Sequence, residues 1–267
     1  MTRKHGYILL GVLGLGLGLG LVLVIQTFQA AHEANCRLDC CGNLELIALA
    51  LDSYHSAYKS LPLAIERTSD GKLWRSWRTQ IYPTYMQQVE MFYDPSSAWD
   101  SPDNLRLLTG TPIPLQRKDS TPHQIILDRV PWAFACPTSH EKKRDGSSYV
   151  AITGDGTAFP PNRALALSDI HDGPENTILV VESTHCRPDW TEPRDLDFDT
   201  MSFKINDTTK PSISSDHTGG AYVCFADGVV AFLTADASEV EVRAMLTVAG
   251  SENISRQELR ERRVLKW

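Results

Sequence analysis

The hydrophobic pattern opens with an apolar run that contains no charged side chain. This run covers residues 7–25, which is nineteen residues. As a helix rising about 1.5 Å per residue it is roughly 28 Å long, close to the ~30 Å hydrocarbon core of a bilayer. Lipid offers no partners to the backbone, so the run has to be helical despite its glycines. It predicts one transmembrane helix.

The flanking charges predict the orientation of this helix. Arg3 and Lys4 precede the run and the larger part of the chain follows it. The positive-inside bias then places the N-terminus in the cytoplasm and the C-terminal domain outside, in the periplasm or at the cell surface. A cleaved secretory signal is the alternative, but its apolar region would span about 7–15 residues, and residues 27–31 offer a poor cleavage site. We expect a single-pass protein of the cytoplasmic membrane.

After the apolar run the pattern changes to the three- and four-residue spacing of an amphipathic helix. The apolar positions are Leu44, Ile47, Ala48, Leu51, Tyr54 and Tyr58. The first proline is Pro62, so we expect the helix to continue through residues 26–59. Its apolar stripe needs a covering partner, and the later strands are the segments large enough to provide one.

Strand patterns gather in the second half of the chain. The apolar runs are residues 148–152, 177–181, 221–226 and 229–233. The last two are separated by Asp227-Gly228, which predicts a hairpin with a two-residue type I′ turn, because that turn needs positive φ at both positions. Ala226 would then lie opposite Val229.

This register assigns the hairpin side chains to two faces. One face would carry Val223, Phe225, Val230 and Phe232, and the other Tyr222, Cys224, Ala231 and Leu233. Both faces are largely apolar, so the hairpin should be central and covered on both sides, one cover being the N-terminal helix. We therefore expect an α+β fold in which a long N-terminal helix packs on a mainly antiparallel sheet.

The remaining segments complete the predicted organisation. Residues 60–135 are irregular, with a short helix expected at 83–92, while Ser238 and Ser255 predict the N-caps of two short C-terminal helices, the first ending near Val248. The expected parts are a cytoplasmic leader (1–6), a transmembrane helix (7–25), its amphipathic continuation (26–59) and an extracytoplasmic α+β domain (60–267).

Charge and motifs exclude several classes of function. The chain carries a net charge of −7, and no basic patch interleaved with aromatic residues occurs, so we expect no nucleic-acid partner. Neither a Gly-x-Ser-x-Gly, a Walker nor a His-Glu-x-x-His pattern is present. We therefore expect no catalytic residue, no enzymatic activity and no cofactor.

Cysteine and acidic residues are the candidate metal ligands. The six cysteines allow fifteen complete disulfide pairings. His32, Cys36 and Cys40 share one helical face but spread over about 12 Å, too far for one zinc ion. The alternating residues Asp195, Asp197 and Asp199 could hold Ca²⁺, but they lack the EF-hand pattern, and a solvated acidic loop is the simpler interpretation. We expect no metal site.

Several motifs occur along most of the chain in one order. They are residues 30–34, 40–55, 99–102, 134–137, 148–154 and 172–182, followed by His217, nine further residues, and Asp227-Gly228. Together they resemble the prepilin-like H-X9-DG family, also called domain of unknown function 1559 and best known from planctomycetes. The resemblance implies a pilin-like architecture related to pseudopilins of type II secretion. It implies contacts with the membrane and with other pilin-like subunits through the N-terminal helix.

The leader keeps one prepilin feature and lacks another. Prepilin peptidase cuts after a glycine, which predicts processing between Gly6 and Tyr7. The glutamate that usually follows at the fifth mature position is replaced by Gly11. That carboxylate offsets the neighbouring subunit's N-terminal amine within the membrane. Its loss suggests a minor subunit, a filament-tip component or simply an anchored protein.

The H-X9-DG signature invites a joint His–Asp site, which strand geometry opposes. His217 is about ten residues from Asp227, roughly 30 Å at about 3.3 Å per residue. We interpret Asp227 and Gly228 as turn residues and His217 as a residue that docks the start of the hairpin, with Tyr54 and His55 as candidate partners. The family motifs also imply a Cys40–Cys136 disulfide, with Cys186–Cys224 as a second pair.

Three functions are compatible with these patterns. The first is a non-enzymatic, membrane-anchored, pseudopilin-like protein that acts in assembly or surface attachment. The second is an anchored module that binds a solute or polysaccharide through Trp74, Trp77 and Trp99, if these are exposed. The third is a metal-dependent hydrolase, which would require His, Asp or Cys side chains to converge in a pocket.

Overall fold

The computed structural model describes the backbone of residues 2–82, 93–109, 113–116, 122–125, 131–138, 146–252 and 254–267. Of these, the side chains of residues 2–17, 19, 113–116 and 122–125 are not described. The short helix expected at 83–92 lies outside the described residues. The chain divides into two compact units, Met1–Leu38 and Asp39–Trp267, and each is treated by itself below.

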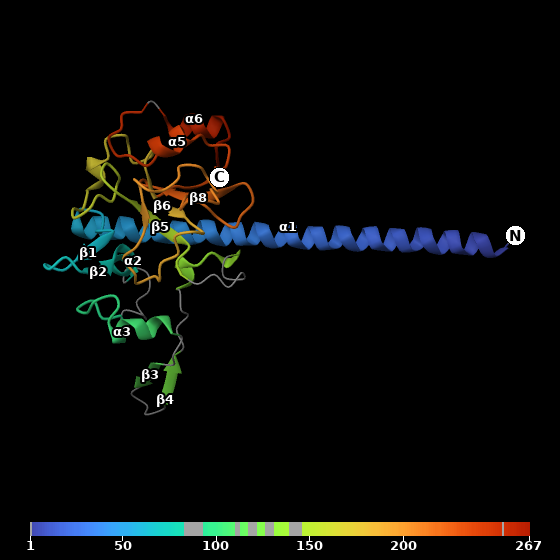
Figure 1. Cartoon of the computed structure of the whole chain (residues 1–267), viewed down its shortest axis with the longest axis horizontal. Helices are drawn as coiled ribbons and strands as arrows, with labels where there is room; N and C mark the ends of the chain where they lie inside the picture. The colour runs from blue at the N-terminus through green and yellow to red at the C-terminus, as the bar shows by residue number, and fades with distance from the viewer. Residues whose placement is uncertain are drawn as a thin grey trace. The chain divides into compact units, whose positions relative to one another are not determined.

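Figure 1 colours the elements in chain order and labels the larger ones. The helical elements are α1 (Thr2–Tyr58), α2 (Trp77–Ile81), α3 (Pro102–Leu105), η2 (Arg106–Leu108), η3 (Trp132–Phe134), η4 (Leu167–Asp169), α5 (Glu239–Ala244) and α6 (Arg256–Glu261). The strands are β1 (Ile65–Arg67), β2 (Leu73–Ser76), β3 (Ile113–Gln116), β4 (Pro122–Ile125), β5 (Tyr149–Thr153), β6 (Ile178–Glu182), β7 (Leu196–Asp197), β8 (Gly220–Phe225), β9 (Val230–Thr234) and β10 (Leu265–Lys266).

Helix α1 contributes to both units. It runs from Thr2 to Tyr58 without an interruption in its helical backbone. In the first unit, the described apolar side chains at 21–25 and Phe28 are exposed. Among the described side chains, none of the helices combines the length and hydropathy that crossing a bilayer requires. Residues 7–17 and 19, most of the predicted span, lie outside that description.

The part of α1 within the second unit is a core element. Leu44 and Ile47 are fully buried and Leu51 is nearly so, as their spacing predicts. The helix ends at Tyr58 because Lys59 adopts a left-handed conformation with φ of 61°. Its N–H bonds to the carbonyl of His55, which closes the last turn.

The main sheet lies in the second unit. Among the described residues it has the strand order β10-β9-β8-β6-β5-β7, and every pair is antiparallel except β5 and β7. Two separate two-stranded sheets pair β1 with β2 and β3 with β4. The fold is therefore mixed α+β, as predicted.

Each face of the main sheet covers a hydrophobic core. One core joins α1 residues such as Leu44 and Ile47 to sheet residues such as Val180. The other lies beneath α5 and α6, coloured red in Figure 1, and contains Val242 and Leu259. The central hairpin is thus covered on two sides, and residues 39–58 of α1 provide one of the covers, as expected.

The hairpin turn differs from the predicted type I′ turn. Cys224 pairs with Val230, so Phe225, rather than Ala226, lies opposite Val229. Gly228 has φ of +85°, whereas Asp227 does not have positive φ. The Gly228 N–H bonds to the Phe225 carbonyl at 3.0 Å, which closes a three-residue loop with glycine in the left-handed position.

The one-residue change in register reverses the faces predicted for β9. Side chains alternate along a strand, so a shift of one residue moves each of them to the opposite face. Val223, Phe225, Ala231 and Leu233 share the core beneath α5 and α6. Tyr222 instead faces Phe232, with ring centroids 5.1 Å apart. The prediction of an apolar hairpin was right, and the assignment of its second strand to faces was wrong.

The two C-terminal helices begin where the sequence predicts. Ser238 accepts a hydrogen bond from the Glu241 N–H, and the Glu241 side chain bonds back to the Ser238 N–H. Ser255 caps α6 by accepting a hydrogen bond from the Glu258 N–H. Helix α5 ends at Ala244, earlier than the predicted end near Val248.

Candidate functional site

A buried cluster of ligand-type side chains forms where α1, η3 and the sheet meet. Its first members are Cys40, on α1, and Cys136, just after η3. Asn43 brings them together because its Nδ2 donates to the carbonyls of Trp132 and Ala135, at 3.2 and 3.0 Å. The Cys136 N–H then donates to Ser148 Oγ at 2.8 Å, which ties the segment to the start of β5.

The sheet supplies the other two members of the cluster. Glu182 is the last residue of β6, and its Oε2 accepts from the N–H of Tyr222 on β8 at 2.7 Å. His217 lies in the segment that leads into β8, where its N–H donates to Ser215 Oγ at 3.1 Å. Its ring also meets the ring of Tyr222 edge to face, with centroids 6.0 Å apart.

The four side chains converge closely. His217 Nε2 lies 3.2 Å from Cys40 Sγ, 3.7 Å from Cys136 Sγ and 3.9 Å from Glu182 Oε1. Cys40 Sγ lies 2.8 Å from Cys136 Sγ. One ligand-type atom from each of the four residues falls within 4.8 Å of every other, and all four residues are buried.

Burial controls the electrostatics of this cluster. The Glu182 side chain is 2% exposed, and loss of solvation, with Cys136 adding to it, raises the pKa of Glu182 to about 8. The Cys40 thiol donates to Cys136, and this bond together with burial raises the Cys40 pKa far above its usual value. Glu182 Oε1 has no hydrogen-bond partner among the described residues.

The arrangement suits metal ligation or thiol chemistry. Two sulfurs, an imidazole nitrogen and a carboxylate oxygen form a mixed donor set of the kind that zinc accepts. A narrow pocket lined in part by Cys136, Glu182 and Asp216 adjoins the cluster.

The two predicted disulfides differ in how close their cysteines lie. Cys40 and Cys136 are adjacent and are both thiols, so a covalent bond between them stays a prediction. Cys186 and Cys224 lie in the two different cores, on opposite faces of the sheet.

The H-X9-DG signature is divided between two locations. His217 joins the cysteine cluster, whereas both carboxylate oxygens of Asp227 accept from Arg256, at 2.8 and 2.6 Å. Gly228 closes the hairpin loop. The candidate partners Tyr54 and His55 make other contacts, with Gln80 and with the Leu167 N–H. Gly6 and Tyr7, at the predicted processing site, lie outside the described side chains.

The three alternating aspartates do not form a cation site in the described structure. Asp195 turns inward and meets Arg78 at 2.6 Å, with both side chains fully buried. It also accepts from the Trp77 Nε1–H at 3.0 Å and from the Ala151 N–H at 2.8 Å. Asp197 Oδ1 instead accepts from the N–H of Asp199, which makes it a local turn cap.

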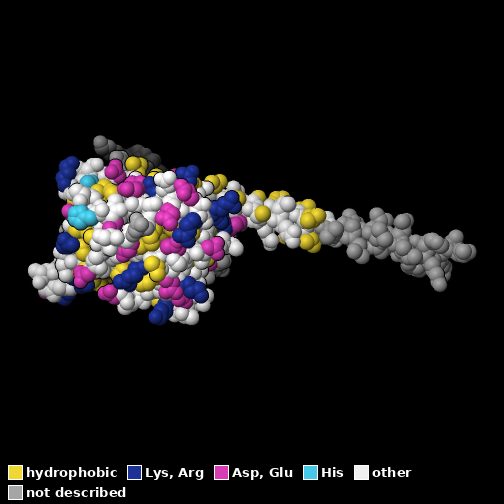
Figure 2. All heavy atoms as spheres, turned by 90° about the horizontal axis from the view of Figure 1, so that it is seen from above, with side chains coloured by type: hydrophobic (Ala, Val, Ile, Leu, Met, Phe, Trp, Pro, Cys, Tyr) yellow, Lys and Arg dark blue, Asp and Glu magenta, His cyan; other side chains and the backbone are white. Residues whose placement is uncertain are grey.

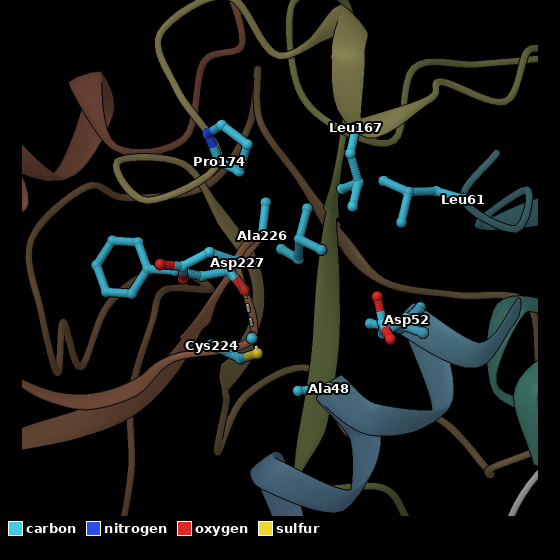
Figure 3. Close-up of a pocket in the computed structure, with 12 residues that line it drawn as sticks. Ala48, Asp52, Leu61, Leu167, Pro174, Cys224, Ala226 and Asp227 are labelled. Atoms are coloured by element: carbon cyan, nitrogen blue, oxygen red, sulfur yellow. Dashed lines mark hydrogen bonds between the residues drawn. The ribbon is translucent and has the colours of Figure 1, made fainter. Parts of the chain in front are cut away.

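A second candidate site is an apolar pocket beside the hairpin loop. Figure 3 shows Ala48 and Asp52 of α1 on one side of it, and Ala226 and Asp227 on the other. Its volume is about 300 Å³, at the lower limit for small-molecule sites. Cys224 lines it together with Leu61, Leu167 and Pro174, so the pocket offers few polar groups for orienting a ligand.

Comparison with known protein families shows which family the chain belongs to. Residues 29–196 match the family described as protein of unknown function, DUF1559. The chain belongs to the DUF1559 family. The matched region contains Cys40, Cys136 and Glu182 and ends before His217 and the hairpin. No curated protein and no solved structure matches the chain.

The sequence did not point to Glu182 as a member of the cluster, nor to the convergence of the four side chains. Glu182 stood within a recognised DUF1559 motif, but no role was assigned to it. Its signal was a glutamate directly after the apolar residues 178–181, all of them buried in β6. A carboxylate at the end of such a strand needs a buried partner.

Proposed function

We propose that this DUF1559 protein is a non-catalytic, membrane-anchored, pseudopilin-like subunit. In this proposal α1 anchors the chain in the cytoplasmic membrane and residues 39–267 form the extracytoplasmic domain. The subunit would act in assembly or surface attachment through contacts between α1 helices. No nucleic acid is involved.

The observation that supports the proposal most strongly is the composition of α1 between residues 21 and 28. Five consecutive apolar side chains, Leu21, Val22, Leu23, Val24 and Ile25, are exposed, and Phe28 is 73% exposed. Successive helical residues are turned by about 100°, so five of them cover every side of the helix. A lipid environment accounts for apolar groups on all sides better than one partner groove does.

The same helix carries the folded domain. Residues 44–51 of α1 supply a core face to the sheet, so the proposed anchor and the core belong to one helical element. A pilin-like subunit requires one helix that serves both as membrane anchor and as part of the domain core. Figure 2 shows basic and acidic side chains interspersed on the visible face of the domain.

The alternative of a sugar-binding module receives less support. Trp77 is fully buried and its Nε1–H is bonded to Asp195, so it offers no exposed ring for stacking. Trp74 and Trp99 are half-buried, and the Trp99 N–H bonds to the Trp74 carbonyl at 2.9 Å.

Photocrosslinking tests the assembly role. A photoreactive phenylalanine analogue at Phe28 should form adducts with a second copy or another pilin-like chain in intact membranes. The matched control is Val240 on α5, which is 71% exposed. Equal adduct formation from both positions, or none from Phe28, would count against assembly through α1.

A further inference from the structure

The buried cluster at Cys40 has the donor set and the spacing of a metal site. We propose that Cys40, Cys136, His217 and Glu182 bind a single Zn²⁺ ion. The ligand atoms are the two Sγ atoms, His217 Nε2 and Glu182 Oε1. This inference goes beyond the proposed membrane role and does not depend on it.

The donor set selects the class of metal. Zinc binds thiolate, imidazole and carboxylate, and structural zinc sites use four protein ligands in a closed tetrahedron. Calcium and magnesium take oxygen ligands, so a centre with two sulfurs disfavours both. The ligands come from α1, the segment after η3, the end of β6 and the segment before β8, so one ion would join four parts of the domain.

The distances within the cluster are close to those of a tetrahedral centre, and small shifts of the ligand atoms, all within 4.8 Å of one another, would complete it. Zinc–ligand bonds of about 2.0–2.3 Å place tetrahedral ligand atoms roughly 3.3–3.8 Å apart. The three distances from His217 Nε2 are 3.2, 3.7 and 3.9 Å. The two sulfurs, 2.8 Å apart, would have to separate by about 1 Å, which rotation about either cysteine Cα–Cβ bond can provide.

The Glu182 carboxylate distinguishes a metal ion from a disulfide. Its Oε1 is buried without a hydrogen-bond partner among the described residues, while Oε2 is bonded to the Tyr222 N–H. A buried carboxylate oxygen is costly unless it is paired or bound to a metal. Zinc would bind Oε1 directly, whereas a neutral Cys40–Cys136 disulfide would leave it with His217 Nε2 at 3.9 Å, beyond hydrogen-bond distance.

The surroundings can balance the remaining charge. Two thiolates and one carboxylate carry three negative charges, so the site with Zn²⁺ bound keeps one negative charge. Arg187 donates to Ser148 Oγ at 3.2 Å, and the same oxygen accepts from the Cys136 N–H. A guanidinium therefore lies just outside the cluster, on the Cys136 side.

Metal analysis of the full-length protein tests the proposal. The chain is purified in mild detergent without chelator or reductant, loaded with Zn²⁺, desalted and analysed by plasma mass spectrometry. We expect one zinc per chain. Cys40→Ser and His217→Ala should reduce the content to near zero, and Glu182→Gln should weaken Zn²⁺ binding at least about 10-fold against a chromophoric chelator.

Two matched variants control for indirect effects. Cys41→Ser removes the neighbouring thiol on the same helix, and Asp227→Asn changes the other half of the signature, which pairs with Arg256. Both should retain one zinc. Co²⁺ bound to the wild type should show thiolate charge-transfer and tetrahedral d–d absorption, and this result does not depend on whether the Cys40 variant folds.

Several results would overturn the proposal. One is a metal-free chain whose mass is lower by two hydrogens and whose digest contains a Cys40–Cys136 disulfide. Others are a metal-free chain with both thiols reduced, and a zinc content unchanged in the Cys40 and His217 variants. A Co²⁺ complex without thiolate charge transfer would likewise exclude the cluster.

Discussion

Residues of the signature motif have separate physical roles. Gly228 permits a left-handed backbone at the hairpin loop, Asp227 holds Arg256, and His217 belongs to the buried cluster. The chemistry of Asp227-Gly228 made a turn predictable from the sequence. The type of the turn was not predictable from the sequence. Two-residue type I′ turns and three-residue loops favour the same residues, and they differ in which residues of the two strands pair.

Substitution of Gly228 tests the turn. Gly228→Ala should destabilise the domain by about 1–2 kcal/mol, because a Cβ is strained at φ of +85°. Space does not limit the substitution, since the nearest atom to such a Cβ is Ala48 Cβ at 4.0 Å. Thermal unfolding should shift by roughly 2–8 °C. Gly228→Asn, which tolerates this conformation better, should lose less, and equal losses would contradict the backbone explanation.

Cys224 should react slowly in the folded protein. Burial raises its pKa to about 12, so at pH 8 about one molecule in ten thousand carries the thiolate, against roughly a quarter for an ordinary thiol. Alkylation followed by mass spectrometry should show the rate increasing with pH toward 12. Urea unfolding should restore ordinary reactivity. Rapid labelling of folded protein at pH 8 would show that the thiol is not buried.

At the scale of elements, local sequence patterns predicted whether a segment is a helix or a strand. How the strands pair depends on contacts within the whole sheet. The apolar stripe of α1, the strands near 150 and 180 and the two capping serines followed from the sequence. The register of β9 did not, because either register would place apolar side chains on both faces. The actual register is decided by partners from elsewhere, including the Tyr222–Phe232 contact.

Asn43 provides a test of how elements are joined. It is 5% exposed and connects α1 to the carbonyls around η3. Asn43→Ala removes a donor from both carbonyls, of which Trp132 keeps the Ala135 N–H at 3.1 Å, and should cost about 1–3 kcal/mol, measured as a lower midpoint of thermal unfolding. Cys41→Ala, on the same helix and half-buried, is the matched control. A stability equal to that of the wild type would show that Asn43 does not hold η3.

At the scale of the whole molecule, the candidate site depends on long-range convergence. Its ligands are separated by as many as 177 positions, between Cys40 and His217. The family motifs bring Cys40 and Cys136 together as a predicted disulfide, but the sequence could not predict that His217 joins them, because this requires the order of strands in the sheet. Glu182 was missed for the same reason, since its partner lies on another strand.

Lysine substitutions in α1 test the proposed anchor. Leu23→Lys places a charge near the outer end of the proposed membrane span, where its cost is smaller than the roughly 2.5–3.5 kcal/mol of the bilayer centre. The variant should be lost from alkali-washed membranes to a greater extent than the wild type. Leu49→Lys, an exposed leucine of the same helix within the second unit, should stay with the membrane. Equal retention of both variants would argue against insertion of residues 21–25.

The central claim is that α1 remains part of the mature protein as its anchor. N-terminal sequencing of native protein extracted from washed membranes tests this claim most directly. We predict a chain that begins at Tyr7, after cleavage at Gly6, and that retains the apolar run. A mature chain that begins beyond Ile25 would show that the run is a cleaved signal, which would contradict an anchored, pseudopilin-like protein.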